Sequence, residues 1–488
     1  MPRHLAFFLI VLAFLSGIVY ASLGLQLLYS LVPAAFLFGA LLTLGESWQI
    51  SFLAALLLLA GSFYYFWDDG QYRALVSRLP QEGQFSGIII NDPRQGQDGL
   101  QSFYLQTDVG KLIVSTAPTP KFSYGDALTA AGKIQTPQPD SYGRYLAKEK
   151  VVGQMASPQI ALISSGGGNK ILALLFRLKQ KIKLSFDRLL PPDKAAFLFG
   201  VMMGVNENFS KQFSQNLQQS GLRFLTAIDG LHMTIMVFII YGLLVYFLPR
   251  RQAFLLTFII IALFVALTGF TVSGIRASVM AFAAGLSTQF GWKYEPRNAL
   301  CLAALVLILQ NSKIPVFDVG FQLSFLAVLS IIYFKPVLAC LLRLDGERDF
   351  FGLKTCLLIT LSVQLATAPV LITQFQNFSL TAFVASVAVV VVLPYLLGTG
   401  LLLAIFSLIF YPLAQAVSFA VSPLIAYVIF IINLFAKWAA PFNPKFSPIA
   451  IAVYYLILIA LMFWFYRKKP SSAATSELVS KTENYKFG

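Results

Sequence analysis

Two polar side chains in the middle of an apolar stretch are the first feature of this sequence that could carry chemistry. Asp229 and His232 lie in the run 221–234 and are three residues apart, so on a helix they share one face. That spacing is typical of a catalytic or metal-binding pair. It is equally typical of a helix start, at which Asp229 accepts hydrogen bonds from the first free N–H groups and His232 packs beneath it. We favour the helix start.

Two further charged residues interrupt apolar segments downstream. Arg276 follows the run 267–275, and Asp318 opens a run that also contains Gln322 and Ser324. Burying such groups in lipid is costly. If a turn at 273–274 breaks the chain, Arg276 starts a helix at the outer interface and extends to water. If the turn lies deeper, Arg276 lines a water-filled path. Asp318 is expected to cap a helix and to be an ion partner for Arg276.

Metal and nucleotide chemistry find little support in the sequence. The two histidines are His4 and His232, and the three cysteines lie in or beside apolar segments. These residues predict no metal site, no disulfide framework and no cofactor. No G-x-x-x-x-G-K-[ST] motif occurs, so energy for any transport must come from elsewhere. An intramembrane enzyme using Asp229 and His232 is the least favoured function, and we expect that the chain is not an enzyme.

The elements that must position these groups are membrane helices. Of the 488 residues, 57% are hydrophobic and 12% are charged, with a mean hydropathy of +0.74; soluble chains are about 45–50% apolar and about 25% charged. Twelve apolar segments approach the roughly 20 residues that a membrane-spanning helix needs. They are residues 5–23, 25–44, 50–66, 227–248, 253–272, 275–291, 297–311, 318–338, 354–374, 380–411, 414–437 and 449–466. The tenth is expected to be broken near Pro394 and Gly398.

Residues 68–165 differ sharply from these segments. Short alternating runs, separated by Gly, Pro, Asn and Asp, predict strands rather than spans. The expected strands are 85–90, 102–106, 111–115, 127–134 and 151–156, with a short helix over 140–149. Five strands and one late helix are typical of a small Greek-key barrel of the OB type. The fold class is thus an α-helical polytopic membrane protein with about 12 spans and a small external OB-like β-barrel.

The charge of this insert is balanced, so we expect it to bind single-stranded DNA weakly, if at all. An OB-fold combines a basic groove with stacking aromatic side chains. The aromatic side chains that the sequence offers for this purpose are Phe103, Tyr104, Phe122 and Tyr124.

A basic amphipathic helix is predicted to follow the insert. Residues 166–194 place apolar side chains at helical spacing, with basic ones on another face; Arg177, Lys179, Lys181 and Lys183 supply much of the charge. One interpretation is anchoring to anionic lipid. The other is a positively charged lip that collects a polyanion. The expected organisation is a three-span anchor at 1–67, the insert at 68–165, this helix at 166–194, a long membrane domain at 195–468 and a disordered cytoplasmic tail at 469–488.

The orientation follows from the positions of Lys and Arg between spans. Twelve crossings place both chain ends on one side, and the basic residues between spans gather on that same side, which is therefore cytoplasmic. These residues are Arg3, Arg250, Arg251, Lys293, Arg297, Arg343, Arg348, Arg467, Lys468 and Lys469. The insert follows three spans and is expected to be extracytoplasmic. The predicted location is the bacterial cytoplasmic (inner) membrane.

Three ordered motifs resemble one known family. The run from Gly221 to His232, the segment 268–280 with Arg276, and the run 318–325 together are similar to the ComEC family of competence proteins. The segments 122–126 and 142–146 are similar to the external OB-like domain of that family. This chain has Asp229 where family members usually have serine. Many members continue into a C-terminal metallo-β-lactamase-like domain, which this sequence is expected to lack.

This resemblance implies a function in natural transformation. Such proteins look like the inner-membrane channel that admits single-stranded DNA, and Asp229, His232, Arg276, Asp318, Gln322 and Ser324 would then line the DNA path or support it. The implied partners are single-stranded DNA, membrane lipids, an external DNA receptor, a separate nuclease and a cytosolic motor. A homo-oligomer is a further state that we consider for this chain. The alternative is a small-solute transporter or permease on the same fold, with a site at broken helices.

The predicted topology can be tested by reporter fusion. Residues 68–165 should lie outside the cytoplasm, because three spans precede them and the basic residues fall on the other face. A reporter that is active only outside the cytoplasm should be active when fused near Thr136. Activity of a reporter that works only in the cytosol, fused at the same place, would overturn the topology.

Overall fold

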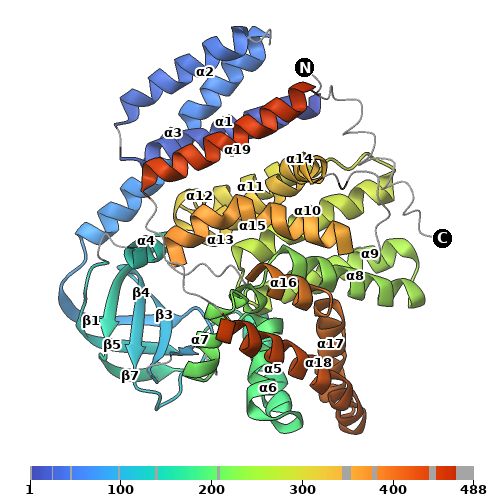
Figure 1. Ribbon diagram of the computed structural model, residues 1–488. Helices are drawn as coiled ribbons and strands as arrows, with labels where there is room; N and C mark the ends of the chain where they lie inside the picture. The colour runs from blue at the N-terminus through green and yellow to red at the C-terminus, as the bar shows by residue number, and fades with distance from the viewer. Residues whose placement is uncertain are drawn as a thin grey trace. The chain divides into compact units, whose positions relative to one another are not determined.

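The computed structural model describes residues 3–24, 26–43, 47–96, 99–137, 141–205, 209–342, 344, 353–375, 382–438 and 447–468 (Figure 1). The predicted tail at 469–488 and the basic residues Arg343, Arg348 and Lys469 lie outside this description. The chain forms two compact units. The first comprises residues 1–213, 224–321 and 394–426, and the second comprises 214–223, 322–393 and 427–488.

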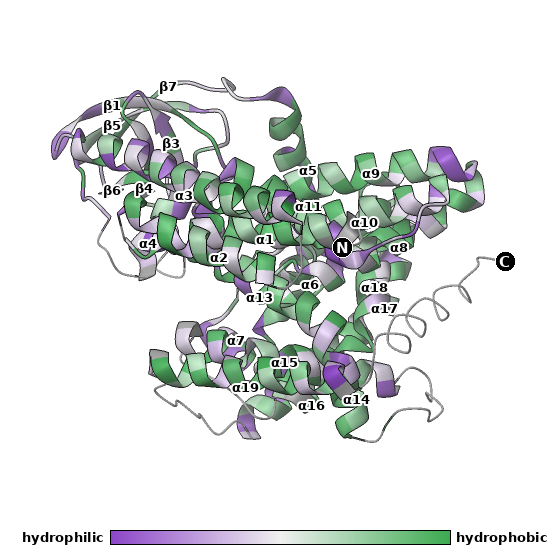
Figure 2. Ribbon diagram, turned by 90° about the horizontal axis from the view of Figure 1, so that it is seen from above, coloured by the Kyte–Doolittle hydropathy of each residue, from purple (hydrophilic) through white to green (hydrophobic). Residues whose placement is uncertain are grey.

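Helices form most of both units, and long apolar helices dominate (Figure 2). The helices largely within the first unit are α1 (Arg3–Ser22), α2 (Leu31–Thr43), α3 (Trp48–Ser77), α4 (Ser141–Lys148), α5 (Lys170–Leu189), α6 (Pro192–Met203), α8 (Gly230–Phe247), α9 (Arg250–Leu267), α10 (Val272–Phe290), α11 (Pro296–Gln310), α12 (Ile314–Phe317) and α17 (Leu393–Ile409). Short 3-10 turns, Leu27–Ser30 and Arg223–Thr226, precede α2 and α8. Within the described residues, seven helices are long and apolar enough to cross a membrane, or eight if α16 and α17 form one broken span.

A multi-pass membrane protein is therefore confirmed, whereas the predicted count of twelve spans is not. α1, α2 and α11 are apolar but shorter than a usual span. α10 is interrupted by polar residues, among them Arg276. The predicted break in 380–411 is present, because α16 ends at Val390 and α17 begins at Leu393.

The second unit contains the remaining helices. They are α7 (Lys211–Gln219), α13 (Val319–Leu329), the π-helical turn Ser330–Phe334, α14 (Lys335–Leu341), α15 (Leu353–Phe375), α16 (Ala382–Val390) and α19 (Pro448–Lys468). α7 and α13 begin in the first unit, and α18 (Tyr411–Trp438) belongs to the first unit up to Ala426 and to the second from Tyr427. Phe334, Val337 and Phe465 form its small core. The Tyr454 hydroxyl donates to the Leu365 carbonyl at 2.8 Å, which ties α19 to α15.

The insert between α3 and α5 is a seven-stranded sheet. Its strands are β1 (Glu82–Ile89), β2 (Arg94–Gln95), β3 (Gln101–Thr107), β4 (Gly110–Thr116), β5 (Ala127–Lys133), β6 (Val151–Ala156) and β7 (Gln159–Ser164). All five predicted strands are present within two or three residues, and α4 covers the predicted helix. The strand order is β6-β4-β3-β1-β5-β7, with β2 beside β3. The sheet is open between β6 and β7, so the closed OB barrel is not confirmed.

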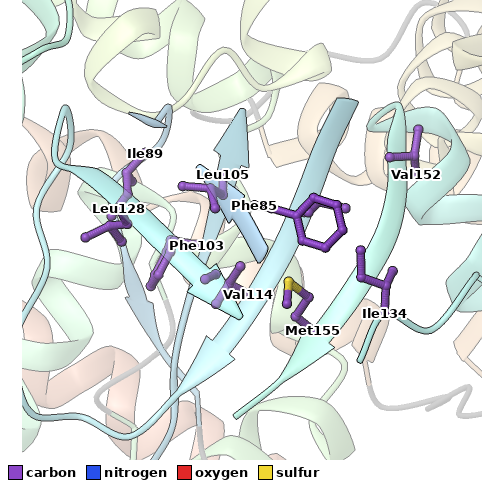
Figure 3. Close-up of a cluster of buried hydrophobic side chains, with 11 residues drawn as sticks. Phe85, Ile89, Phe103, Leu105, Val114, Leu128, Ile134, Val152 and Met155 are labelled. Carbon is purple, nitrogen blue, oxygen red and sulfur yellow. The ribbon is translucent and has the colours of Figure 1, made fainter. Parts of the chain in front are cut away.

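Alternating side chains fill the inside of this curved sheet. In β3, Phe103 and Leu105 point inward and are 1% and 0% exposed, while their neighbours face out. Figure 3 shows these side chains meeting those of β1, β4, β5 and β6 in one core. The pairing of β4 with β6 is parallel. A parallel pair needs a crossover connection, and α4 lies within it.

α3 reaches from the membrane segment into the core of the sheet. The sequence predicted a span at 50–66, but the helix continues to Ser77. Its last turns carry Tyr72 and Val76, one helical turn apart, and both pack against the sheet core with Leu79. The Tyr72 hydroxyl donates to the Val151 carbonyl at 2.9 Å. One rigid helix therefore belongs to both the membrane anchor and the β-domain.

α6 is enclosed by other parts of the first unit. Its residues from Phe197 to Met203 are all buried, although the helix has only twelve residues. Gly400 of α17 faces α6 without a side chain. If this residue carried a Cβ atom, that atom would lie 2.9 Å from the Met202 sulfur, so the backbone of α17 approaches α6 closely. Lys194 donates to the Ser422 hydroxyl of α18 at 2.6 Å. α6 is a central packing element of this unit.

Candidate functional site

The first motif starts α8, as predicted. An Asp229 carboxylate oxygen accepts from the His232 backbone N–H at 3.0 Å, which caps the helix. The same oxygen lies 2.7 Å from Nδ1 of His232, and Nε2 lies 3.1 Å from the Leu225 carbonyl oxygen. His232 is 2% exposed. Its ring therefore locks the 3-10 turn Arg223–Thr226 to the helix start.

Both ring nitrogens of His232 have a partner. Nδ1 faces the Asp229 carboxylate and Nε2 faces the Leu225 carbonyl oxygen. Asp229 is therefore held by His232 through both its imidazole ring and its backbone N–H.

The second motif turns the chain a few residues earlier than expected. The turn is at 268–271, where Gly269 and Phe270 both have positive φ, 85° and 54°. Thr271, not Ser273, caps the next helix, accepting from the Gly274 N–H at 3.3 Å. Phe270 is a bulky residue in a left-handed conformation and is 55% exposed. Backbone strain of this kind clusters at functional sites.

Arg276 is buried on the second turn of α10 and does not extend to the interface. It is 5% exposed. One guanidinium nitrogen contacts the Met280 sulfur at 3.9 Å. Another lies so close to Gly230 that a Cβ atom added to this glycine would be only 2.8 Å away. No described group accepts from its Nε atom. The guanidinium group therefore lies against the start of α8 and is only partly satisfied by protein.

The third motif pairs with the β-domain, so the expected ion pair between Asp318 and Arg276 is wrong. One Asp318 oxygen caps α13, accepting from the Phe321 N–H at 2.6 Å. The other accepts from Lys148 of α4 at 2.7 Å, and the two side chains are 12% and 10% exposed. Burial lowers the pKa of Lys148, but attraction to Glu149 and Asp318 outweighs burial and raises the pKa above its ordinary value. Gln322 and Ser324 follow on α13, half-buried and buried.

The starts of α8, α10 and α13 lie together. Arg276 lies against Gly230, as described above. A Cβ at Gly320 would lie 3.7 Å from the Ser273 hydroxyl, so the second and third motifs also touch. The N-terminus of a helix carries a partial positive charge. Three such ends, one buried guanidinium and two capping carboxylates thus form a polar centre within apolar helices.

A group of charged residues that the sequence analysis missed joins the β-domain to the helices. Asp68 of α3 accepts from Lys150 at 2.9 Å and from the Ser312 hydroxyl at 2.7 Å. Lys313 is 1% exposed, donates to Asp69 at 2.9 Å and lies 3.6 Å from the centre of the Tyr72 ring. Burial lowers the pKa of Lys313, although Asp69 and Asp68 oppose this.

Asn311 adds one more contact, donating to the Lys148 carbonyl oxygen. We name the set Asp68, Asp69, Lys148, Lys150, Ser312, Lys313 and Asp318 the docking cluster. One signal in the sequence could have indicated this cluster. Lys313 is a lone lysine between two apolar segments, and Asp68 and Asp69 are a pair of aspartates at the end of a span, 244 residues earlier.

The basic helix is only partly open to solvent. Asn169 caps α5, and Leu175, Ile182 and Phe186 are buried. Lys179 is buried too and pairs with Asp92 of the β-domain at 3.0 Å, so it is not available to a ligand. Arg177 and Lys181 are exposed, and Lys183 is half-buried. Ile171, Leu174 and Leu184 remain exposed, which leaves an apolar stripe beside the charges.

The described residues contain no group of three or more His, Cys, Asp or Glu side chains that could hold a metal ion.

A membrane domain with a buried polar centre, joined to a small β-domain, is the class that fold and site define. The family model described as Competence protein matches residues 201–468, which contain all three motifs and more than half of the chain. The chain belongs to this family, as the motifs predicted.

A named relative supports the same assignment. The protein "ComE operon protein 3" of Bacillus subtilis (strain 168) is 24% identical over 314 residues. The match covers 64% of this chain and 39% of that protein. No solved structure matches the chain.

The pairing of Lys148 with Asp318 can be tested by a double-mutant cycle. Lys148→Ala leaves a buried carboxylate without its partner, which is expected to cost about 3–5 kcal/mol. Asp318→Asn keeps the helix cap and removes only the charge. The double variant should lose less than the sum of the single losses, measured as thermal unfolding of the purified protein in detergent.

Two controls sharpen this cycle. The first control is Arg73, whose side chain is 76% exposed in its pair with Asp69. Arg73→Ala should lower the free energy of unfolding by only about 0–1 kcal/mol. A cycle between Arg276→Gln and Asp318→Asn should be additive. If the effects of Lys148→Ala and Asp318→Asn were additive while those of Arg276→Gln and Asp318→Asn were coupled, the ion pair between Arg276 and Asp318 predicted from the sequence would be correct.

Proposed function

We propose that this chain is a DNA-uptake subunit of the bacterial cytoplasmic membrane, which passes single-stranded DNA during natural transformation. The observation that carries the proposal is the polar centre where α8, α10 and α13 begin. Charged groups are rare inside membrane domains and usually mark the path of a substrate or ion. Arg276 makes no direct ion pair with a carboxylate among the described residues, although the charge of Asp229 acts on it, and it is the buried cation of this centre that we assign to a phosphodiester.

The electrostatics of the centre are compatible with a polyanion. Asp229 contacts the His232 ring at 2.7 Å, and Asp318 is paired with Lys148 at 2.7 Å. Each carboxylate that could repel phosphate thus has its own compensating partner. The excess charge comes from Arg276 and from three helix N-termini, both of which attract phosphate.

The β-domain is suited to guide a strand towards this centre. Through Lys148 it contacts the third motif directly. Arg94 of β2 would lie 3.8 Å from a Cβ at Gly269, so it also reaches the turn of the second motif. In this proposal the β-domain is extracytoplasmic and both chain termini are cytoplasmic.

Other components complete the proposed uptake system. An external receptor delivers DNA, a separate nuclease provides the single strand, and a cytosolic motor or the proton gradient pulls it. We assign no nuclease activity to this chain. Lipid contacts involve the exposed apolar stripe of α5, and homo-oligomer formation stays a prediction.

A small-solute permease is the second candidate. The break between α16 and α17 favours it, because broken helices form the midplane sites of many transporters. A deletion strain that takes up labelled DNA normally, but fails to import a solute, would favour this candidate.

Arg276 provides a direct test of the DNA path. Arg276→Gln should lower uptake of labelled DNA into the cytosol at least tenfold, because phosphate loses its buried cation, while Arg276→Lys should keep part of it. Arg250→Gln changes an exposed arginine at the start of α9 and is the matched control. Normal uptake by a well-expressed Arg276→Gln strain would contradict the proposal.

The exposed and buried cations of α5 should behave differently. Arg177→Gln with Lys181→Gln should weaken uptake and flatten its dependence on salt, because fewer counterions are exchanged. Lys179→Gln should instead lower thermal stability, because it leaves Asp92 without its partner. The same salt dependence in wild type and in the double variant would show that α5 serves lipid only.

A further inference from the structure

Two exposed tyrosines form a pair on α4. Tyr142 and Tyr145 are three residues apart, so they lie on one face of the helix. They are 48% and 42% exposed. Their rings are nearly parallel, with centroids 6.3 Å apart and planes 19° apart. Two large rings side by side on a soluble domain form a flat aromatic surface.

The four rings that the sequence offered for base stacking are occupied elsewhere. Phe103 is buried in the sheet core and packs edge-on against Phe122, with centroids 5.7 Å apart. Tyr124 packs on Phe176 of α5 at 5.1 Å. The fourth ring, Tyr104, lies beneath the Lys111 ammonium group at 4.5 Å. The tyrosine pair on α4 is therefore a more accessible aromatic surface than any of these four.

α4 holds this surface rigidly. Leu146, one helical turn after Tyr142, is fully buried and anchors the helix on the β-domain. At its end Lys148 is fixed by Asp318 at 2.7 Å. Tyr145 also lies near Tyr104 of β3. Because the rings are already positioned, binding a ligand on them costs little conformational entropy.

Cations connect the pair to the second motif. The Lys148 ammonium group lies 4.9 Å from the centre of the Tyr145 ring, and Arg144, between the tyrosines, is exposed. Arg94 lies near Tyr104 and near Gly269. The neighbour of Gly269 is the exposed Phe270. A chain of contacts thus runs from the tyrosines through Tyr104 and Arg94 to the turn before Arg276.

We infer that Tyr142 and Tyr145 form a stacking platform for the unpaired bases of single-stranded DNA, upstream of the polar centre. This inference rests on the proposed function and adds a base-binding site to it. Aromatic faces beside cations are how proteins bind single strands without reading sequence. Insertion into lipid headgroups is the competing use of exposed tyrosines. The parallel rings and the contacts leading to the second motif favour bases.

The test measures DNA binding by the full chain in nanodiscs of phosphatidylethanolamine and phosphatidylglycerol. The probes are a fluorescent oligothymidylate of about 15 nucleotides and an abasic strand of the same length and charge. Tyr142→Ala and Tyr145→Ala should each weaken oligothymidylate binding about fivefold or more, since stacking is worth about 1–3 kcal/mol per base. Binding of the abasic strand should not change. Tyr142→Phe should keep the wild-type affinity.

Tyr246→Ala is the matched control, because Tyr246 is 84% exposed at the end of α8. It should bind both probes as wild type does. An independent readout uses wild-type protein alone: an oligonucleotide containing iododeoxyuridine, irradiated on the protein, should cross-link to the peptide that contains Tyr142 and Tyr145. This readout does not depend on the folding of any variant.

Four outcomes would overturn the platform. Unchanged oligothymidylate binding by both alanine variants, with wild-type protein binding well, rejects the platform and leaves the proposed function standing. Equal losses for the abasic strand show that charge, not stacking, was disturbed. Altered stability in nanodiscs with unchanged DNA binding assigns the rings to lipid. No binding of either probe by wild-type protein rejects the proposed function together with the platform.

Discussion

The need to pair buried charges where α3 leaves the membrane segment governs the rest of the structure. Asp68 and Asp69 cannot be buried against protein without cations, because an unpaired buried charge costs several kcal/mol. Lys150 from the β-domain and Lys313 from the helical segment supply them. The β-domain, α3 and the segment after α11 are therefore fixed together. Lys148 extends this arrangement to Asp318 and so to the start of α13.

Local rules predicted local structure well. The alternation of residues 101–107 located β3, and the same rule located the other long strands except β7, whose alternating run 159–164 was overlooked. Asp229 and Asp318 were both predicted as helix caps, and both are caps, because a capping carboxylate needs only N–H groups two or three residues on. The turn at 268–271 was placed a few residues late, since Thr271 and Ser273 are equally good caps by sequence.

Tertiary partners could not be predicted in the same way. Asp318 was expected to pair with the nearby Arg276, yet its partner Lys148 is 170 residues away. Lys179 was grouped with three other cations by helical spacing, but Asp92 of another domain buries it. Spacing along one helix shows which side chains share a face, and not which other element covers that face. The exposed ring pair on α4 became recognisable only when the sheet core had accounted for the other aromatic side chains.

The docking cluster also has a consequence for biogenesis. Asp68 and Asp69 meet Ser312 and Lys313 only after another 244 residues have been synthesised. At bacterial elongation rates of about 5–20 residues per second, this takes roughly 12–50 s. During that time the β-domain can fold on its own core, but its acidic partners must stay hydrated, and α3 cannot settle against α12. The β-domain and the end of α3 thus exist before Ser312 and Lys313, which contact Asp68 and Asp69, have been synthesised.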